Sequence, residues 1–444
     1  MDEHLSLASR IVLNPLRAGL PTGQDNIVDL LVRVQAPDAL EAATDARPAQ
    51  AIALVIDRSG SMAGRPLTEA RRCAEFVVSR LRPLDAVSVV QFDNRVHRLW
   101  PAVPLGSGDA ARGAISRIHS GGNTNLHGGW LEGAHTLAEV SGSGLKRVIL
   151  LSDGGANEGL TDQEQITAQC AEWAARGITT STYGLGDNFN EELMVNMART
   201  GGGNHYYGDT ADDLREPFQQ ELDLLANLAL RKLDLSIWAP DGLQIEMLNE
   251  LPTTEAGWHL PDLAWGAEAW AIVRVTIPAG ALPDLGDRLT ILRVSVDGQT
   301  LRGDAVTLER SGLALPVMSA LAFAKLPDDQ LVSRRLIELA AADALSRMRL
   351  AADQGDWVAV DRLLEEASHQ FAGNEWVVAV LAAMTEIAAS RSRERMMKES
   401  MYSASRLRSR LSAKEESVRF SIASESVETP AYLRRKPSQG KGDS

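Results

Sequence analysis

The sequence predicts an α/β domain with a doubly wound, mostly parallel sheet, inserted in a β-sandwich and followed by a C-terminal helical region. Three observations predict this fold class. Residues 48–226 alternate apolar runs with amphipathic segments, as βαβ units do. Residues 232–308 alternate apolar and polar side chains between turns, as antiparallel strands do. Residues 313–411 are rich in Ala and Leu at helical spacing.

The first expected elements precede the α/β block. Residues 8–13 and 26–35 are strand-like, and we expect them to pair with strands beyond residue 228, which makes the sandwich discontinuous. The block begins with the apolar run 51–56, which is typical of a central strand buried on both faces. Pro66 then opens a helix, because proline fits the first helical turn. Further strands are expected at 86–92, 96–99, 148–151, 179–185 and 205–207, and helices at 109–118, 127–140, 162–176, 190–199 and 212–225.

The second half of the chain should begin with sandwich strands at 232–238, 243–247, 270–277, 289–296 and 305–308, with turns at 240–242, 278–280 and 297–298. The helices that follow should break near residues 355 and 373, with Asp356 and Asn374 as N-caps. Two antiparallel helices and a long third are the simplest packing. We therefore expect N-terminal sandwich strands in 1–47, the α/β domain in 48–226, the β-sandwich in 227–312, a helical region in 313–414 and a disordered tail in 415–444.

Composition limits the class of protein. The 444 residues are 44% hydrophobic and 23% charged, which indicates a soluble globular protein of two or three domains. The net charge of -14 argues against a nucleic-acid partner. Because neither a secretory signal nor an apolar stretch of the ~20 residues that span a bilayer is visible, we expect no transmembrane segment and a cytoplasmic location. Cys73 and Cys170 are expected to be buried free thiols.

Oxygen-bearing side chains cluster around two of the buried strands. Asp57, Ser59 and Ser61 follow the first strand, Asp153 follows the strand at 148–151, and Thr124 lies in the glycine-containing loop 121–125. Because ligands of doubly wound sheets gather beyond the carboxyl ends of the strands, we expect these five residues to meet at one rim. Two carboxylates and three hydroxyls suit Mg²⁺ or Mn²⁺ and do not suit Zn²⁺.

The motif Asp57-Arg58-Ser59-Gly60-Ser61, with Thr124 and Asp153 downstream, resembles the metal-ion-dependent adhesion site of von Willebrand factor type A domains. The resemblance covers about residues 48–226. It implies that Ser59, Ser61 and Thr124 bind the metal directly, that Asp57 acts through water and that Asp153 shifts with the conformational state. It also implies that an acidic side chain of a partner protein completes the coordination. The whole layout resembles bacterial relatives of the inter-alpha-trypsin-inhibitor heavy chain and chloride-channel-accessory groups.

We therefore expect a non-enzymatic, metal-dependent adhesion or scaffold module of bacterial type, which binds an Asp or Glu of a partner protein. One alternative is a regulatory subunit of an ATPase or chelatase machine. A hydrolase is disfavoured because the Gly-x-Ser-x-Gly elbow is absent. His127, beside the metal-site loop, should form a local hydrogen bond rather than bind metal. The basic segment 391–410 is either a solvated helix end or a second docking site, for an acidic partner or a membrane surface.

Overall fold

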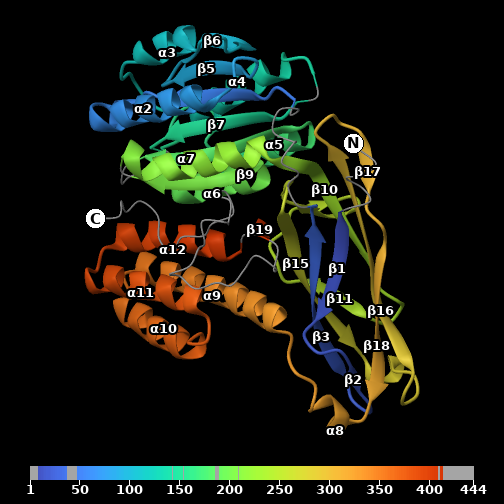
Figure 1. The fold of residues 1–444 in the computed structure, drawn as a ribbon. Coiled ribbons are helices and arrows are strands. Elements are labelled where there is room, and N and C mark those ends of the chain that lie inside the picture. Colours follow the sequence, from blue (N-terminus) through green and yellow to red (C-terminus); the bar gives the residue numbers. More distant parts are fainter. Residues whose placement is uncertain are drawn as a thin grey trace. The chain divides into compact units, whose positions relative to one another are not determined.

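The computed structural model describes residues 9–37, 48–142, 144–153, 155–185, 190–208, 210–408 and 411–413 (Figure 1). The predicted tail, 415–444, lies outside these residues. The described chain divides into two compact units. Residues 48–227 and 390–402 form the α/β unit, and residues 9–37, 228–389 and 403–413 form the sandwich unit.

The α/β unit is built on a six-stranded sheet in the order β6-β5-β4-β7-β8-β9. Its neighbouring strands pair in parallel except at the edge, where β6 runs antiparallel to β5. Every residue of β4 is buried, as expected for a strand covered on both faces. The predicted doubly wound fold is thus confirmed. The strands are β4 (Ala51–Asp57), β5 (Ala86–Phe92), β6 (Val96–Pro104), β7 (Lys146–Ser152), β8 (Ile178–Leu185) and β9 (Gly202–Gly208).

Helices connect the parallel strands of this unit along the chain (Figure 1), whereas β5 and β6, and also α3 and α4, follow one another directly. Thr210 begins the last of them with a capping box, in which its side chain and that of Asp213 each accept the other residue's backbone N–H. The elements are a 3-10 turn, η2 (Gly60–Met62), and the helices α2 (Arg65–Arg80), α3 (Asp109–Ser116), α4 (Leu126–Ala138), α5 (Gln163–Ala175), α6 (Glu191–Thr200) and α7 (Ala211–Ala226).

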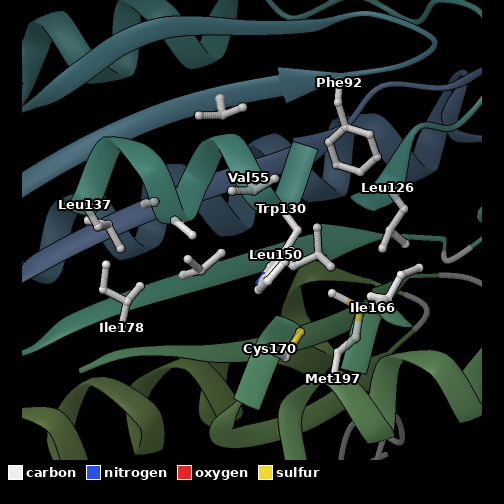
Figure 2. Close-up of a cluster of buried hydrophobic side chains, with 14 of the residues drawn as sticks. Val55, Phe92, Leu126, Trp130, Leu137, Leu150, Ile166, Cys170, Ile178 and Met197 are labelled. Carbon is white, nitrogen blue, oxygen red and sulfur yellow. The ribbon is translucent and has the colours of Figure 1, made fainter. Parts of the chain in front are cut away.

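Helix α4 packs closely on the sheet and carries the largest side chain of the buried cluster in Figure 2. Trp130 is fully buried there, and its indole N–H donates to the hydroxyl of Thr180 at 2.9 Å. Gly133 permits the close approach, since a Cβ at this position would lie 2.4 Å from a methyl carbon of Val55 on β4. This contact fixes the start of α4, and with it the loop that contains Thr124, near the end of β4.

The sandwich unit contains two sheets, one in the order β1-β3-β15-β11 and the other in the order β12-β13-β10-β16-β18-β2. The N-terminal strand β3 pairs with β15 along its whole length, so the predicted discontinuous sandwich is confirmed. The strands are β1 (Arg10–Pro15), β2 (Leu20–Pro21), β3 (Asn26–Gln35), β10 (Leu228–Trp238), β11 (Gln244–Met247), β12 (Thr253–Thr254), β13 (Gly257–Leu260), β14 (Leu263–Ala264), β15 (Ala267–Ile277), β16 (Arg288–Thr300), β17 (Ala305–Thr307), β18 (Ser311–Met318) and β19 (Leu411–Ala413).

Two expectations for this unit are wrong. Asp297 and Gly298 do not form a turn, because β16 continues through them and pairs with β17 on the same stretch. The helical region does not begin at 313, because residues 311–318 form β18, which pairs with β16 and β2. Its Leu and Ala residues suggest a helix by composition, yet Leu315 and Val317 are buried in the alternating pattern of a strand.

In the described part of the chain five helices follow β18, where two antiparallel helices and a long third were expected. They are α8 (Ala320–Phe323), α9 (Gln330–Asp353), α10 (Trp357–Gln370), α11 (Glu375–Ala389) and α12 (Arg393–Leu407). The expected packing is wrong because the longest helix, α9, comes first and the chain breaks again near Arg391, whose φ is +51°. The predicted N-caps are confirmed: Asp356 accepts the N–H of Ala359, and Asn374 that of Val377.

Buried charges join α9 to the sandwich sheet. The guanidinium of Arg335 lies 4.6 Å from the ring centroid of Trp270 and pairs with Glu338 at 2.9 Å. Glu268 of β15 lies 3.9 Å from Arg335 and also pairs with Arg33 of β3 at 2.8 Å. Breaking such a buried pair leaves an uncompensated charge, so these contacts hold helix and sheet in one folded unit.

The two cysteines, Cys73 on α2 and Cys170 on α5, are buried free thiols, as expected. Burial raises the pKa of both thiols, which keeps them protonated and unreactive. Within the described part of the chain, the helices are too short or too polar to cross a membrane.

Candidate metal-binding rim

The five predicted site residues lie at the carboxyl ends of β4 and β7 and just before α4. Asp57 is the last residue of β4. Ser59 directly precedes η2, and Ser61 lies within it. Asp153 directly follows β7, and Thr124 lies two residues before α4 begins. Four of these side chains are buried, whereas that of Ser61 is exposed. We call these five residues and the three loops around them the rim: loop one is 58–62, loop two is 119–125 and loop three is 153–158, in which residue 154 is not described.

Asp57 is held rigidly from two sides. Its Oδ1 accepts the backbone N–H of Ser59 at 2.8 Å, and its Oδ2 accepts the hydroxyl of Ser152 at 2.6 Å. Burial raises the pKa of Asp57 to about 6, although both hydrogen bonds act in the opposite direction. The nearby charge of Asp153 raises this pKa further. Two carboxylates therefore lie close together in a buried place, with both of their pKa values raised.

Asp153 contains the clearest unsatisfied atom of the rim. Its Oδ1 is buried and has no hydrogen-bond partner. Burial raises the pKa of Asp153, and the hydrogen bond from Ser61 only partly opposes this effect. The hydroxyl of Ser61 also lies 3.1 Å from that of Ser59. Because an unpartnered buried carboxylate oxygen is costly, a cation bound beside these hydroxyls would satisfy it.

Asp93 joins loop one to loop two, although the sequence placed it only between the strands expected at 86–92 and 96–99. Its Oδ2 lies 2.5 Å from the guanidinium of Arg58 and accepts the backbone N–H of Gly122 at 3.1 Å. Its backbone carbonyl accepts the N–H of Asn125 at 2.8 Å. Gly121 leaves room for this arrangement, because a Cβ there would lie 2.0 Å from the Asp93 carboxylate.

Asn157 and Glu158 join loop three to loop two. The Asn157 side chain accepts the backbone N–H of Thr124 at 2.8 Å, and the N–H groups of both residues donate to the Thr124 carbonyl at 3.1 Å. The hydrogen bond from Gly60 N–H to the Gly122 carbonyl, 2.8 Å long, completes the connection between loops one and two. Thr124 is therefore positioned by backbone contacts from both sides. The sequence pattern missed Asn157 because nothing in its spacing distinguishes it from other loop asparagines.

The described residues contain no group of three or more His, Cys, Asp or Glu side chains that could hold a metal ion. A metal at the rim would therefore depend on hydroxyl oxygens, which suit Mg²⁺ better than Zn²⁺. The neighbouring His127 contacts Gln169 through its Nε2 at 3.0 Å, which confirms the expected local hydrogen bond.

The basic segment 391–410, described as far as residue 408, is partly engaged within the chain. Arg408 pairs with Asp343 at 2.8 Å and with Glu250 at 3.6 Å. Lys398 is buried and lies 3.6 Å from Glu394. These contacts reduce the charge that the segment can offer, and its role as a second docking site stays a prediction.

Known proteins resemble parts of this chain. The family model described as von Willebrand factor type A domain matches residues 51–220. The uncharacterized protein YfbK of Escherichia coli (strain K12) is 30% identical over 180 residues, which are 39% of this chain and 31% of YfbK. Inter-alpha-trypsin inhibitor heavy chain H1 of Mesocricetus auratus is 29% identical over 197 residues, 41% of this chain and 21% of the relative. This chain therefore spans less than a third of either relative.

Solved structures are similar to this chain over most of its length. The von Willebrand factor type A protein from Catenulispora acidiphila superposes with a TM-score of 0.66 and 16% sequence identity, over 89% of this chain and 96% of that one. At this level of identity the likeness concerns the fold. Its coverage includes residues of both units.

Proposed function

Because residues 51–220 match the family model of the von Willebrand factor type A domain, we propose that the rim binds Mg²⁺ or Mn²⁺ and, through it, an acidic side chain of a partner protein. Domains of this family often mediate metal-dependent protein interactions. In this proposal Ser59, Ser61 and Thr124 bind the metal, while Asp57 and Asp153 provide the negative charge. The chain then acts as a scaffold, without catalysis of its own.

The unpartnered, buried Oδ1 of Asp153 is the observation that carries the proposal. A folded protein rarely leaves such an atom without a partner unless a ligand supplies one. The charge of Asp153 lies close enough to Asp57 to raise the pKa of the Asp57 carboxyl group further, so the rim concentrates negative charge at a place lined by hydroxyls. A divalent cation would give the Oδ1 of Asp153 a partner and would relieve the repulsion between the two carboxylates.

The hydrogen bonds of Asp57 support a role outside direct coordination. Both of its carboxylate oxygens already accept a hydrogen bond from the chain, from Ser59 and from Ser152. Neutral hydroxyls would then supply most of the direct contacts. When bound, the metal would supply a Lewis-acidic position that a partner's carboxylate could occupy. A glutamate or aspartate is the side chain that matches such a position.

Titration of the full chain with Mn²⁺, followed by electron paramagnetic resonance of the free ion, tests the proposal. The wild type should bind one ion, and Asp153→Ala should weaken binding by about tenfold or more, because an anionic contact is lost. Asp109→Ala is the matched control, since this carboxylate is 80% exposed and lies on α3, outside the three rim loops. No Mn²⁺ binding by the wild type at millimolar concentration would overturn the proposal.

The partner can be sought with the same variants. Affinity capture from a native extract should recover it in Mg²⁺, and not in chelator or with Asp153→Ala. Recovery of an ATPase in this way would point to the regulatory-subunit alternative, in which the rim serves an enzyme machine.

A further inference from the structure

A hollow of about 260 Å³ lies on one sheet of the sandwich unit, outside the metal-binding rim. Its lining includes Ser236 and Trp238 of β10, Arg293 and Ser295 of β16, and Arg310 just before β18. We call it the Trp238 groove. All of these residues belong to the sandwich unit, and the lining contains two cations but no carboxylate.

Strand register explains why a hollow forms here. Trp238 pairs with Arg293 and Ser236 pairs with Ser295 across β10 and β16, so the four side chains share one face. On the other side of Arg293, β18 contributes Gly312, which has no side chain. Two serines and a glycine thus leave space between the larger Trp238 and the two arginines.

The ring of Trp238 positions the guanidinium of Arg293 for contact with an anion. Its guanidinium lies 5.3 Å from the ring centroid of Trp238, whose side chain is 53% exposed. Stacking on the ring restricts the guanidinium while leaving its N–H groups free to bind a carboxylate in two-point fashion. Neither Arg293 nor Arg310 forms an ion pair with a carboxylate anywhere in the described ranges, so both charges are available to a ligand.

The carboxylates that follow on the same face already have partners. Asp234 and Asp297 form the next pair across β10 and β16. Asp234 lies 3.2 Å from the Nδ1 of His259, and Asp297 accepts the hydroxyl of Thr307 at 2.5 Å. They do not line the groove, so its cationic character is preserved.

We propose that the Trp238 groove binds an acidic peptide segment of a partner protein, with Arg293 and Arg310 pairing with its carboxylates. Charge complementarity identifies the occupant, because these unpaired cations gather on a chain whose net charge is -14. Size favours side chains over a free cofactor, whose pockets usually measure roughly 300–1,000 Å³. The hydroxyl of Ser236 donates to the carbonyl of Ala256, so it adds an acceptor for a peptide N–H.

The groove contains no metal-binding set, so this inference is independent of the proposed function and can be tested in chelator. The probe is a capped, fluorescein-labelled heptapeptide containing four glutamates, and the matched probe has glutamines instead. Fluorescence anisotropy is measured on the full chain in EDTA. The glutamate peptide should bind, the glutamine peptide should not, and higher salt should weaken binding.

Three variants locate the binding. Arg293→Gln and Arg310→Gln should each weaken it about tenfold, and Trp238→Ala should weaken it because Arg293 loses its support. Arg302→Gln, an exposed arginine in the turn after β16, is the matched control and should change nothing. Asp153→Ala should also bind the peptide normally, which separates this result from the metal rim.

Two results would overturn the inference. One is equal binding of the glutamate and glutamine peptides. The other is binding that survives both arginine substitutions. If inorganic phosphate binds at the groove but the glutamate peptide does not, the assignment to an acidic peptide is wrong.

Discussion

Asp57→Asn should stabilise the metal-free protein, although Asp57 belongs to the proposed metal site. The wild-type carboxylate is completely buried, and burial raises its pKa to about 6 from an ordinary 3.8. Asparagine has nearly the same shape and can keep both hydrogen bonds. Its carbonyl oxygen would accept the N–H of Ser59, and its amide would donate to the hydroxyl of Ser152. The substitution therefore removes a buried charge with little other change.

The magnitude follows from the pKa shift. The rise of this pKa from 3.8 to about 6, at about 1.36 kcal/mol for each tenfold change in the protonation equilibrium, corresponds to roughly 3 kcal/mol of the free energy of unfolding. Below pH 3.8 the carboxyl group of Asp57 is protonated in both the native and the unfolded state, so it does not lower the free energy of unfolding. Between pH 3.8 and about 6 the unfolded state releases its proton first, so the native state is progressively destabilised as pH rises. The full penalty applies above about pH 7.

Urea denaturation of the full chain in EDTA measures this effect, at pH 6.5 to 8 to stay above the pI of about 5.2. The relevant transition is the one that Mn²⁺ shifts in the wild type. Asp57→Asn should raise its midpoint by up to roughly 1–2 M urea, and Mn²⁺ should stabilise the wild type only. Asp109→Asn, on an exposed carboxylate, is the control. A midpoint for Asp57→Asn at or below that of the wild type in EDTA would refute the reasoning, because Asp57 would then stabilise the fold by itself.

Three further predictions follow from the α/β unit. The dissociation constant for Mn²⁺ should rise as pH falls below about 6, because Asp57 must release its proton for the ion to bind; isothermal titration calorimetry between pH 5.5 and 8 measures this, and a flat profile would contradict it. Asp93→Ala should weaken Mn²⁺ binding roughly tenfold with an unchanged circular dichroism spectrum, because two rim loops lose their shared acceptor; unchanged affinity would show that the contact does not position the site. Gly133→Ala should lower the thermal midpoint, since its Cβ would lie 2.4 Å from a β4 methyl carbon, whereas Gly113→Ala, in an open part of α3, should raise it slightly; changes of the same sign would argue against the packing account.

The elements that the sequence predicted well are those whose signal is local. The apolar run that became β4 has to be buried on both faces, and the residues that end it have to emerge at the rim of a parallel sheet. The N-caps Asp356 and Asn374 could also be predicted from the sequence, because an N-cap contacts a backbone N–H only three residues away.

The errors arose where distant pairing overrides local preference. An Asp-Gly pair usually marks a turn, yet β17 pairs with β16 across Asp297 and Gly298 and keeps the strand extended. The strand β18 has the composition of a helix, and only its position between β16 and β2 makes it a strand. Asp93 and Asn157 escaped notice for the same reason, since their partners lie about 30 residues away along the chain.

The carboxylate of Asp93 has a different role at the rim from those of Asp57 and Asp153. Burial alone would raise the pKa of Asp93, but hydrogen bonds from the N–H groups of Arg95 and Gly122 and the charge of Arg58 lower it overall. Its ionised form therefore stabilises the loops before any metal arrives. Asp57 and Asp153 show the opposite behaviour, because burial raises their pKa and neither has a cation beside it in the described structure. Loops held by Asp93 keep two unfavourable charges in place, so a divalent ion bound as we propose would gain affinity from charge repulsion that it relieves rather than from loops that it must order.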